Sequence, residues 1–255
     1  MVSNLGASIG WGLLVGASLL AGAVVAALLN LPARVAAIVT SFGGGLLFAA
    51  VAFELVPEAD DRAGAALTAL GLLAGTLAFV AADAWLTRDP SMKEVRRSGH
   101  AAAAGRPMPA VDRAEAGRGE AIAAGLFVDG VPESIALGLT VAEGEIGLAL
   151  LAGIVVGNIV EAYGAAQPIA AGGHTPRFAV GLLGGIGLAL ALATVLGGTV
   201  LADASPEFIG SAQAVAAGAV LAVVSISIIP HAFSEVSSAV AGATVAGFIA
   251  GFLLS

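Results

Sequence analysis

Apolar residues dominate the chain in long runs, each about the length that a helix needs to cross a bilayer. A membrane-spanning helix takes about 20 mostly apolar residues. The eight runs occupy residues 5–31, 35–57, 63–87, 121–142, 146–172, 178–202, 208–230 and 236–254. Short breaks carrying Pro, Asp, Arg or Gly separate most of them. The pattern predicts an all-α polytopic membrane protein, with eight transmembrane helices in a single domain spanning residues 1–255.

The segment 88–120 interrupts this pattern. It holds seven of the ten basic residues and three prolines but no long apolar run, so we expect a disordered polar loop. If this loop is cytoplasmic, the loops after the first and fifth runs are cytoplasmic too, and nine of the ten basic residues then lie on that side. The positive-inside rule therefore predicts a multi-pass protein of the cell membrane with both termini outside the cytoplasm. The first run is too long for a signal-peptide core and lacks a basic leader, so we expect a retained span.

Composition narrows the function classes. Only 11% of the residues are charged and 58% are hydrophobic, whereas a soluble domain carries roughly 25% charged residues. The net charge of −8 gives no basic surface for nucleic acid. The absence of cysteine excludes disulfides and thiolate metal sites. No phosphate-binding glycine loop, Ser-His-Asp set or His-Glu-x-x-His motif is present, so we expect neither an enzyme nor a prosthetic cofactor.

Three carboxylates are placed deep within the predicted spans. Asp129 and Glu133 are four residues apart in the fourth run, which puts them on one helical face. Glu161 lies at a similar depth in the fifth run, which a short turn joins to the fourth. An ionised side chain at mid-bilayer is costly, and no lysine or arginine lies inside a span to neutralise these acids. A bound divalent cation would compensate them; two alternatives remain open, a proton or sodium relay and protonated acids in a non-transporting membrane scaffold.

Secondary candidates surround this group. Pro132 tends to kink the fourth span and to free a backbone carbonyl near the acids. Glu54, near the outer end of the second run, is either an entrance ligand or a group that reaches the lipid headgroups. His231 follows the seventh run and either helps to release a metal or is incidental. Tyr163 and Gln167 either line a pathway or bond across helices.

Two distant segments resemble each other. Residues 45–59, at the end of the second run, and residues 218–232, at the end of the seventh, both finish in an apolar, polar, two-aliphatic, Pro, x, Ala pattern. The two runs cross the membrane in opposite directions. The resemblance therefore predicts an inverted repeat, which is typical of transporters.

These motifs resemble those of the ZIP (Zrt/Irt-like) family of divalent metal transporters. The family's fourth span typically reads His-Asn-x-Pro-Glu-Gly, which falls on residues 129–134. Its fifth-span His-Glu-x-Pro-x-Glu motif carries a metal ligand four residues after the first His, and that position falls on Glu161. The ending of the second run, residues 54–59, resembles the family's His/Glu-x-x-Pro-Glu ending.

The resemblance implies a 3+2+3 inverted-repeat architecture and secondary transport of a divalent transition metal (Zn, Fe, Mn or Cd) toward the cytoplasm. It assigns the primary ligands to Asp129, Glu133 and Glu161, with Glu54, Asn158 and His231 as secondary candidates. The family's second-site positions are Gly130 and Asn158 here, which implies a single carboxylate-rich site; oxygen ligands favour Mn²⁺ or Fe²⁺ more than a histidine site would. The expected partners are the metal ion and the lipid bilayer, with a homodimer as a possible assembly.

Overall fold

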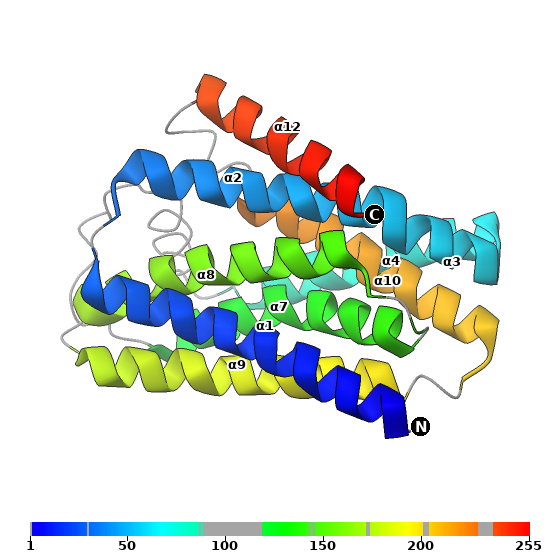
Figure 1. The fold of residues 1–255 in the computed structure, drawn as a ribbon, viewed down its shortest axis with the longest axis horizontal. Helices are drawn as coiled ribbons and strands as arrows, with labels where there is room; N and C mark the ends of the chain where they lie inside the picture. Colours follow the sequence, from blue (N-terminus) through cyan, green and yellow to red (C-terminus); the bar gives the residue numbers. More distant parts are fainter. Residues whose placement is uncertain are drawn as a thin grey trace.

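The computed structural model describes residues 2–29, 31–86, 88, 119–142, 144, 146–171, 174–200, 204–228 and 237–255 (Figure 1). All regular secondary structure in these residues is helical. In chain order the elements are α1 (Val2–Leu28), α2 (Ala33–Ala50), η1 (Val51–Leu55), α3 (Val56–Ala63), α4 (Ala65–Leu86), α7 (Gly119–Ala142), α8 (Leu148–Ala171), α9 (Pro176–Thr199), α10 (Pro206–Val223), η2 (Val224–Ile228) and α12 (Ser237–Leu254). The predicted loop 88–120 lies outside the described residues, apart from Arg88 and the first two residues of α7.

Seven helices among the described residues are long and apolar enough to cross a membrane. They are Leu5–Leu28, Arg34–Ala63, Ala65–Trp85, Gly125–Ala142, Leu148–Ala166, Pro176–Thr199 and Pro206–Ile226. The last predicted run contains a shorter apolar helix, Ser238–Leu254. The all-helical prediction is confirmed for the described residues, and the seven long helices are typical of a polytopic integral membrane protein.

The outer surface of the helices is apolar, as lipid requires. On α4, Leu67, Leu70, Leu73 and Leu77 recur every three or four residues and are between 46% and 62% exposed. This spacing places all four on one face of the helix. A continuous exposed leucine face of this kind fits a hydrocarbon environment and not water.

Close helix crossings hold the bundle together. The helix α9 packs against α1 and α7, and α1 also packs against α8. Two further pairs, α2 with α12 and α4 with α10, complete the arrangement, while α8 and α7 contact α2 and α10 respectively (Figure 1). Many crossings use glycine, because small residues let backbones approach in lipid, where apolar side chains gain nothing by leaving the solvent.

The two π-helical turns interrupt long helices. In the first, the N–H of Val56 bonds to the carbonyl of Val51, five residues earlier. Pro57 follows immediately; it has no N–H to give to the carbonyl of Phe53, so the regular ladder cannot continue through this point. The chain absorbs the loss by widening one turn, and α2, η1 and α3 run on as one continuous span.

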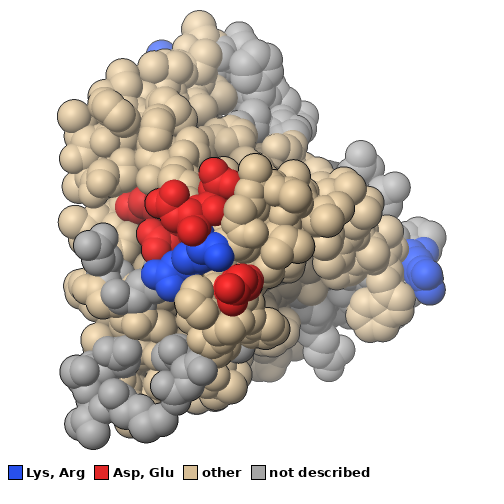
Figure 2. All heavy atoms as spheres, turned by 90° about the vertical axis from the view of Figure 1, so that its right-hand side faces the viewer, with Lys and Arg blue, Asp and Glu red and all other residues tan. Residues whose placement is uncertain are grey.

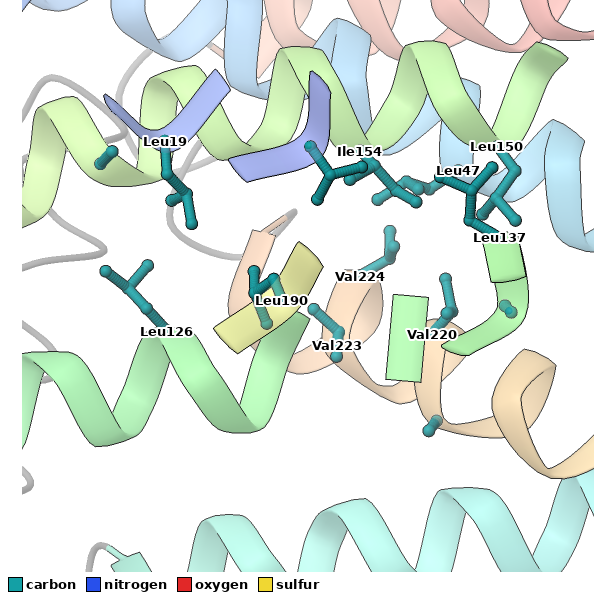
Figure 3. Packing of buried hydrophobic residues seen from close by; sticks show 14 of the residues in the cluster. Leu19, Leu47, Leu126, Leu137, Leu150, Ile154, Leu190, Val220, Val223 and Val224 are labelled. Atoms are coloured by element: carbon teal, nitrogen blue, oxygen red, sulfur yellow. The ribbon is translucent and has the colours of Figure 1, made fainter. Parts of the chain in front are cut away.

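The buried core lies where α2, α7, α8 and α10 meet, with α1 and α9 alongside. Figure 3 shows Leu47, Leu150, Ile154, Leu137 and Val220 pointing into a common space. All five are at most 2% exposed. They fill the interior between the middle of the bundle and the end at which α3 lies.

Acidic side chains gather at the α3 end. Glu58, Asp60, Asp61 and Glu207 belong to α3 and to the first turn of α10, and Figure 2 shows the acidic side chains together on this face. Within α3, Arg62 pairs with Glu58 at 2.8 Å. Both chain termini also lie toward this end (Figure 1).

Candidate functional site

Two of the predicted ligands lie together in the core. Asp129 and Glu133 are one turn apart on α7, and they are 2% and 5% exposed respectively. Their carboxyl groups are close enough to interact electrostatically. Neither α7 nor α8 contains a lysine or arginine. Two ionised carboxylates this close repel each other, so protonation of one of them or a bound cation would stabilise the pair.

The helix α7, which carries this pair, packs closely against α9. A side chain at Gly130 would meet Leu190 at 2.6 Å, and a side chain at Gly138 would meet the backbone of Thr194. The helix α7 continues through Pro132 without a break. The glycine contacts fix the face of α7 that lies against α9, and thereby the direction in which Asp129 and Glu133 project.

Asn158 is held in one orientation by α1. Its side chain is 2% exposed, and its Nδ2 donates to the carbonyl of Val15 at 3.3 Å and to the Ser18 hydroxyl at 3.1 Å. The Ser18 hydroxyl itself donates to Val15 at 2.6 Å. A backbone carbonyl can only accept, so the nitrogen of the amide must face α1. The amide oxygen of Asn158 is therefore the atom that remains for a partner elsewhere.

Glu161 lies one turn further along α8 and is half-buried. Among the described residues, no group of three or more His, Cys, Asp or Glu side chains is gathered closely enough to hold a metal ion. The structure thus brings Asp129 and Glu133 together, while Glu161 does not complete a cluster with them in this conformation. Its assignment as a ligand stays a prediction.

Glu54 makes a contact with α8 that was not predicted from the sequence. Its carboxylate accepts from the N–H of Ala149 at 2.9 Å and from that of Leu150 at 3.1 Å. These donors belong to the first turn of α8, where N–H groups have no partner within the helix. Gly147 precedes them, and a side chain there would lie 2.6 Å from the Glu54 carboxylate. Glu54 caps α8, and an entrance-ligand role for it stays a prediction.

Of the other secondary candidates, only Tyr163 has a side chain within the part of the chain that the structure describes. The hydroxyl of Tyr163 accepts from the N–H of Leu31 at 2.8 Å, which ties α8 to the connection between α1 and α2. Tyr163 therefore bonds between elements, as one of the two sequence interpretations holds. His231 lies outside the described residues, and so does the side chain of Gln167.

An apolar cavity of about 630 Å³ lies between α4, α7 and α10. Its lining includes Phe79, Phe127, Pro132 and Phe208, with Ser211 as a rare polar group. Phe127 and Phe208 are exposed, so this cavity opens at the outer surface of the bundle. The cavity leaves α7 without close packing beside its proline, so the helix that carries the two acids has room to bend on this side.

Sequence reasoning missed several buried polar residues. Ser18, Ser134 and Gln213 are all at most 4% exposed. The hydroxyl of Ser134, next to Glu133, has no hydrogen-bond partner among the described residues. Serine and threonine are frequent in membrane helices, where they bond to their own backbone, so their presence alone does not identify a site.

Comparison with known proteins adds no assignment. No protein-family model matches the chain, and the curated proteins include no significant match to it.

Proposed function

We propose that the protein is a carrier of divalent transition-metal ions, with an architecture like that of the ZIP family. The observation that carries the proposal is the buried pair of Asp129 and Glu133, one turn apart in a membrane helix that has no basic residue. Two carboxylates in an apolar interior destabilise the folded protein when they are ionised. A bound cation of charge +2 would neutralise their two negative charges.

The donor set favours a cation that accepts oxygen ligands. Asp129 and Glu133 supply carboxylate oxygens, and Asn158 has its amide nitrogen bonded to α1, which leaves its oxygen for a ligand. Glu161, one turn from Gly157 on α8, would join them after a movement of α8 relative to α7. Hard oxygen donors suit Mn²⁺ and Fe²⁺, and Zn²⁺ also accepts carboxylates.

Packing supports an inverted repeat in the two halves of the chain. The turns η1 and η2 occupy the same place in the two aligned segments, so that Val51 corresponds to Val224 and Leu55 to Ile228. A proline follows each turn at the same distance, Pro57 in the first segment and Pro230 in the second. The local break in the helix is thus repeated together with the sequence pattern.

Two glycine crossings correspond in the same way. Gly45 of α2 abuts the backbone of Thr244 in α12, while its aligned counterpart, Gly218 of α10, abuts the backbone of Leu72 in α4. In each half, the second helix thus meets the third helix of the other half at the same glycine. An exchange of this kind is expected when two halves are related by a pseudo-two-fold axis in the membrane plane, and it supports alternating access by movement of one half against the other.

Charge distribution supports the proposed orientation. Arg34 and Arg177 begin α2 and α9, and Arg88 follows α4, so these three lie at the end of the bundle opposite α3. At the α3 end, α3 and the first turn of α10 carry one basic residue, Arg62. Under the positive-inside rule, we expect the α3 end and both termini to lie outside the cytoplasm, and ZIP-like uptake would run from the acidic face inward.

The test is uptake of Mn²⁺, Fe²⁺, Zn²⁺ and Cd²⁺ into proteoliposomes. The double variant Asp129→Asn with Glu133→Gln keeps the shape of both side chains and should abolish uptake, while Glu207→Gln, an exposed acid of the acidic face, should leave it intact. Flux that follows a pH gradient and is independent of metal would favour the proton or cation carrier. Absence of any flux through the wild-type protein would favour the scaffold.

A further inference from the structure

The carboxylate of Glu54 joins the second membrane span to the start of α8 by capping that helix from a distant part of the chain. Other helices supply their own caps: Thr175 accepts from the N–H of Phe178 at the start of α9, and Ser205 accepts from that of Phe208 at the start of α10. The start of α8 instead receives a side chain from 95 residues earlier in the chain, on the π-helical turn of another span. A cap of this origin fixes the distance between two helices.

The surrounding residues are fitted to this contact. Gly147 does not adopt a left-handed backbone conformation, so the backbone alone does not require glycine there. A side chain there would meet the Glu54 carboxylate at 2.6 Å, so the carboxylate would have to move away from its present position. The acceptor is a carboxylate, and it faces the positive end of the α8 dipole, which makes both hydrogen bonds stronger than those between neutral groups.

The contact lies at the outer edge of a group of core side chains that we call the apolar plug, formed by Leu47, Leu137, Leu150 and Ile154. Leu150 provides one of the N–H groups bonded by Glu54, and its side chain lies beside that of Leu47, from α2 (Figure 3). Ile154 lies one turn further along α8, and Leu137 lies one turn beyond Glu133 on α7. These side chains separate the acid pair from the α3 end. Movement of α8 away from α2 would open this plug, and it would first have to break both Glu54 bonds.

The aligned segment of the other half carries a different residue at the position of Glu54. In the aligned segments, the position of Glu54 is occupied by Ser227, which has neither the length nor the charge of a glutamate. The two aligned segments therefore differ in residue type at this position.

We propose that Glu54 and the N-terminus of α8 form a releasable latch that holds the α3 end of the bundle closed. The closure itself depends on the fold alone; its consequence for transport rests on the proposed function. In a carrier, such a latch biases the population toward conformations closed at the α3 end, and its loss shifts the population toward open ones.

Distances measured in the reconstituted protein test the latch. The chain has no native cysteine, so spin labels at Asp60→Cys on α3 and Leu148→Cys at the start of α8 report this contact specifically. Both positions are exposed. We expect one short distance population in the otherwise unchanged protein. Glu54→Gln should add a second, longer population, and so should Gly147→Ala, which displaces the carboxylate without removing it.

The matched control is Glu58→Gln. Glu58 lies one turn from Glu54 and pairs with Arg62 on its own helix, so its loss should leave the distances unchanged. Unchanged distances in both Glu54→Gln and Gly147→Ala overturn the latch. Loss of helical circular dichroism in both variants also overturns it, because the contact would then be needed for folding. Metal uptake measured in the same vesicles judges the transport function separately: absent uptake with altered distances removes the carrier and keeps the latch.

Discussion

Gly16 of α1 and Gly187 of α9 lie backbone to backbone where their helices cross. A Cβ on Gly16 would stand 2.7 Å from the carbonyl oxygen of Gly187, and one on Gly187 would stand 2.6 Å from that of Gly16. Gly187→Val should therefore force the helices apart and destabilise the protein by about 1–3 kcal/mol, measured as a lower midpoint of thermal unfolding in detergent.

The control for this crossing lies two residues away on the same helix. A Cβ on Gly185 would meet nothing within 4 Å. Gly185→Ala should leave the unfolding midpoint unchanged or raise it slightly, because alanine has the higher helix propensity by about 1 kcal/mol. Equal losses in the two variants would show that the crossing does not depend on the absence of a side chain at Gly187.

Metal binding should stabilise the folded protein. A ligand present at 100 times its dissociation constant adds about 2.7 kcal/mol to the free energy of unfolding. We expect Mn²⁺ or Zn²⁺ to raise the thermal midpoint of the purified protein in detergent, and Glu133→Gln to remove that increase. A shift of the same size in Glu133→Gln would place the bound ion elsewhere, for example on the acidic residues of the α3 end.

Ser18 should influence metal affinity without touching the metal. Its hydroxyl accepts from the Asn158 amide and thereby keeps the amide oxygen turned away from α1. Ser18→Ala should weaken binding by about 10-fold, as loss of a group that orients a ligand typically does. The measurement is the concentration of metal at half-maximal uptake. Ser41→Ala serves as the control, since the buried Ser41 hydroxyl donates to the carbonyl of Ala37 on its own helix. A similar change in both variants would indicate a general effect on packing.

Helix caps at the two membrane faces should contribute to stability independently. The hydroxyls of Thr175 and Ser205 accept from the third helical N–H of α9 and α10, at 3.3 Å in each case. Alanine at either position should cost about 1 kcal/mol of unfolding free energy, and the double substitution about twice that, because the sites lie on different helices. Ser211→Ala offers a comparison, since that exposed hydroxyl bonds back to Glu207 and caps nothing. No loss in the cap variants would indicate that water replaces the hydroxyls fully.

The sequence predicted those features that depend on local spacing. Helix type and approximate length follow from the apolar runs, and the proximity of Asp129 and Glu133 follows from four-residue spacing on one helix. The contact of Glu54 with α8 could not be predicted in this way, because it joins residues 95 positions apart and depends on how α2 crosses α8. The one available signal was Gly147, a glycine directly before an apolar run, which also has an ordinary explanation as part of a turn.

The rotation of the helices relative to one another was the feature that the sequence predicted least well. The sequence placed Glu161 at the depth of the acid pair, and depth alone does not determine whether two helices turn their acids toward each other. The orientation of Asn158 could not be predicted for the same reason. Its amide is oriented by hydrogen bonds to Val15 and Ser18, which lie on a different helix.

The widened turn η1 also determines how α3 meets its neighbour. One additional residue in a helix rotates everything after it by about 100° relative to an uninterrupted spiral. Ala59, fully buried beyond the turn, lies against Gly210 of α10. Deleting a single residue between Val51 and Leu55 would swing Ala59 away from that contact and bring a different side of α3 against α10. The number of residues in this span therefore determines which face of α3 packs against α10, just as the identity of the side chains does.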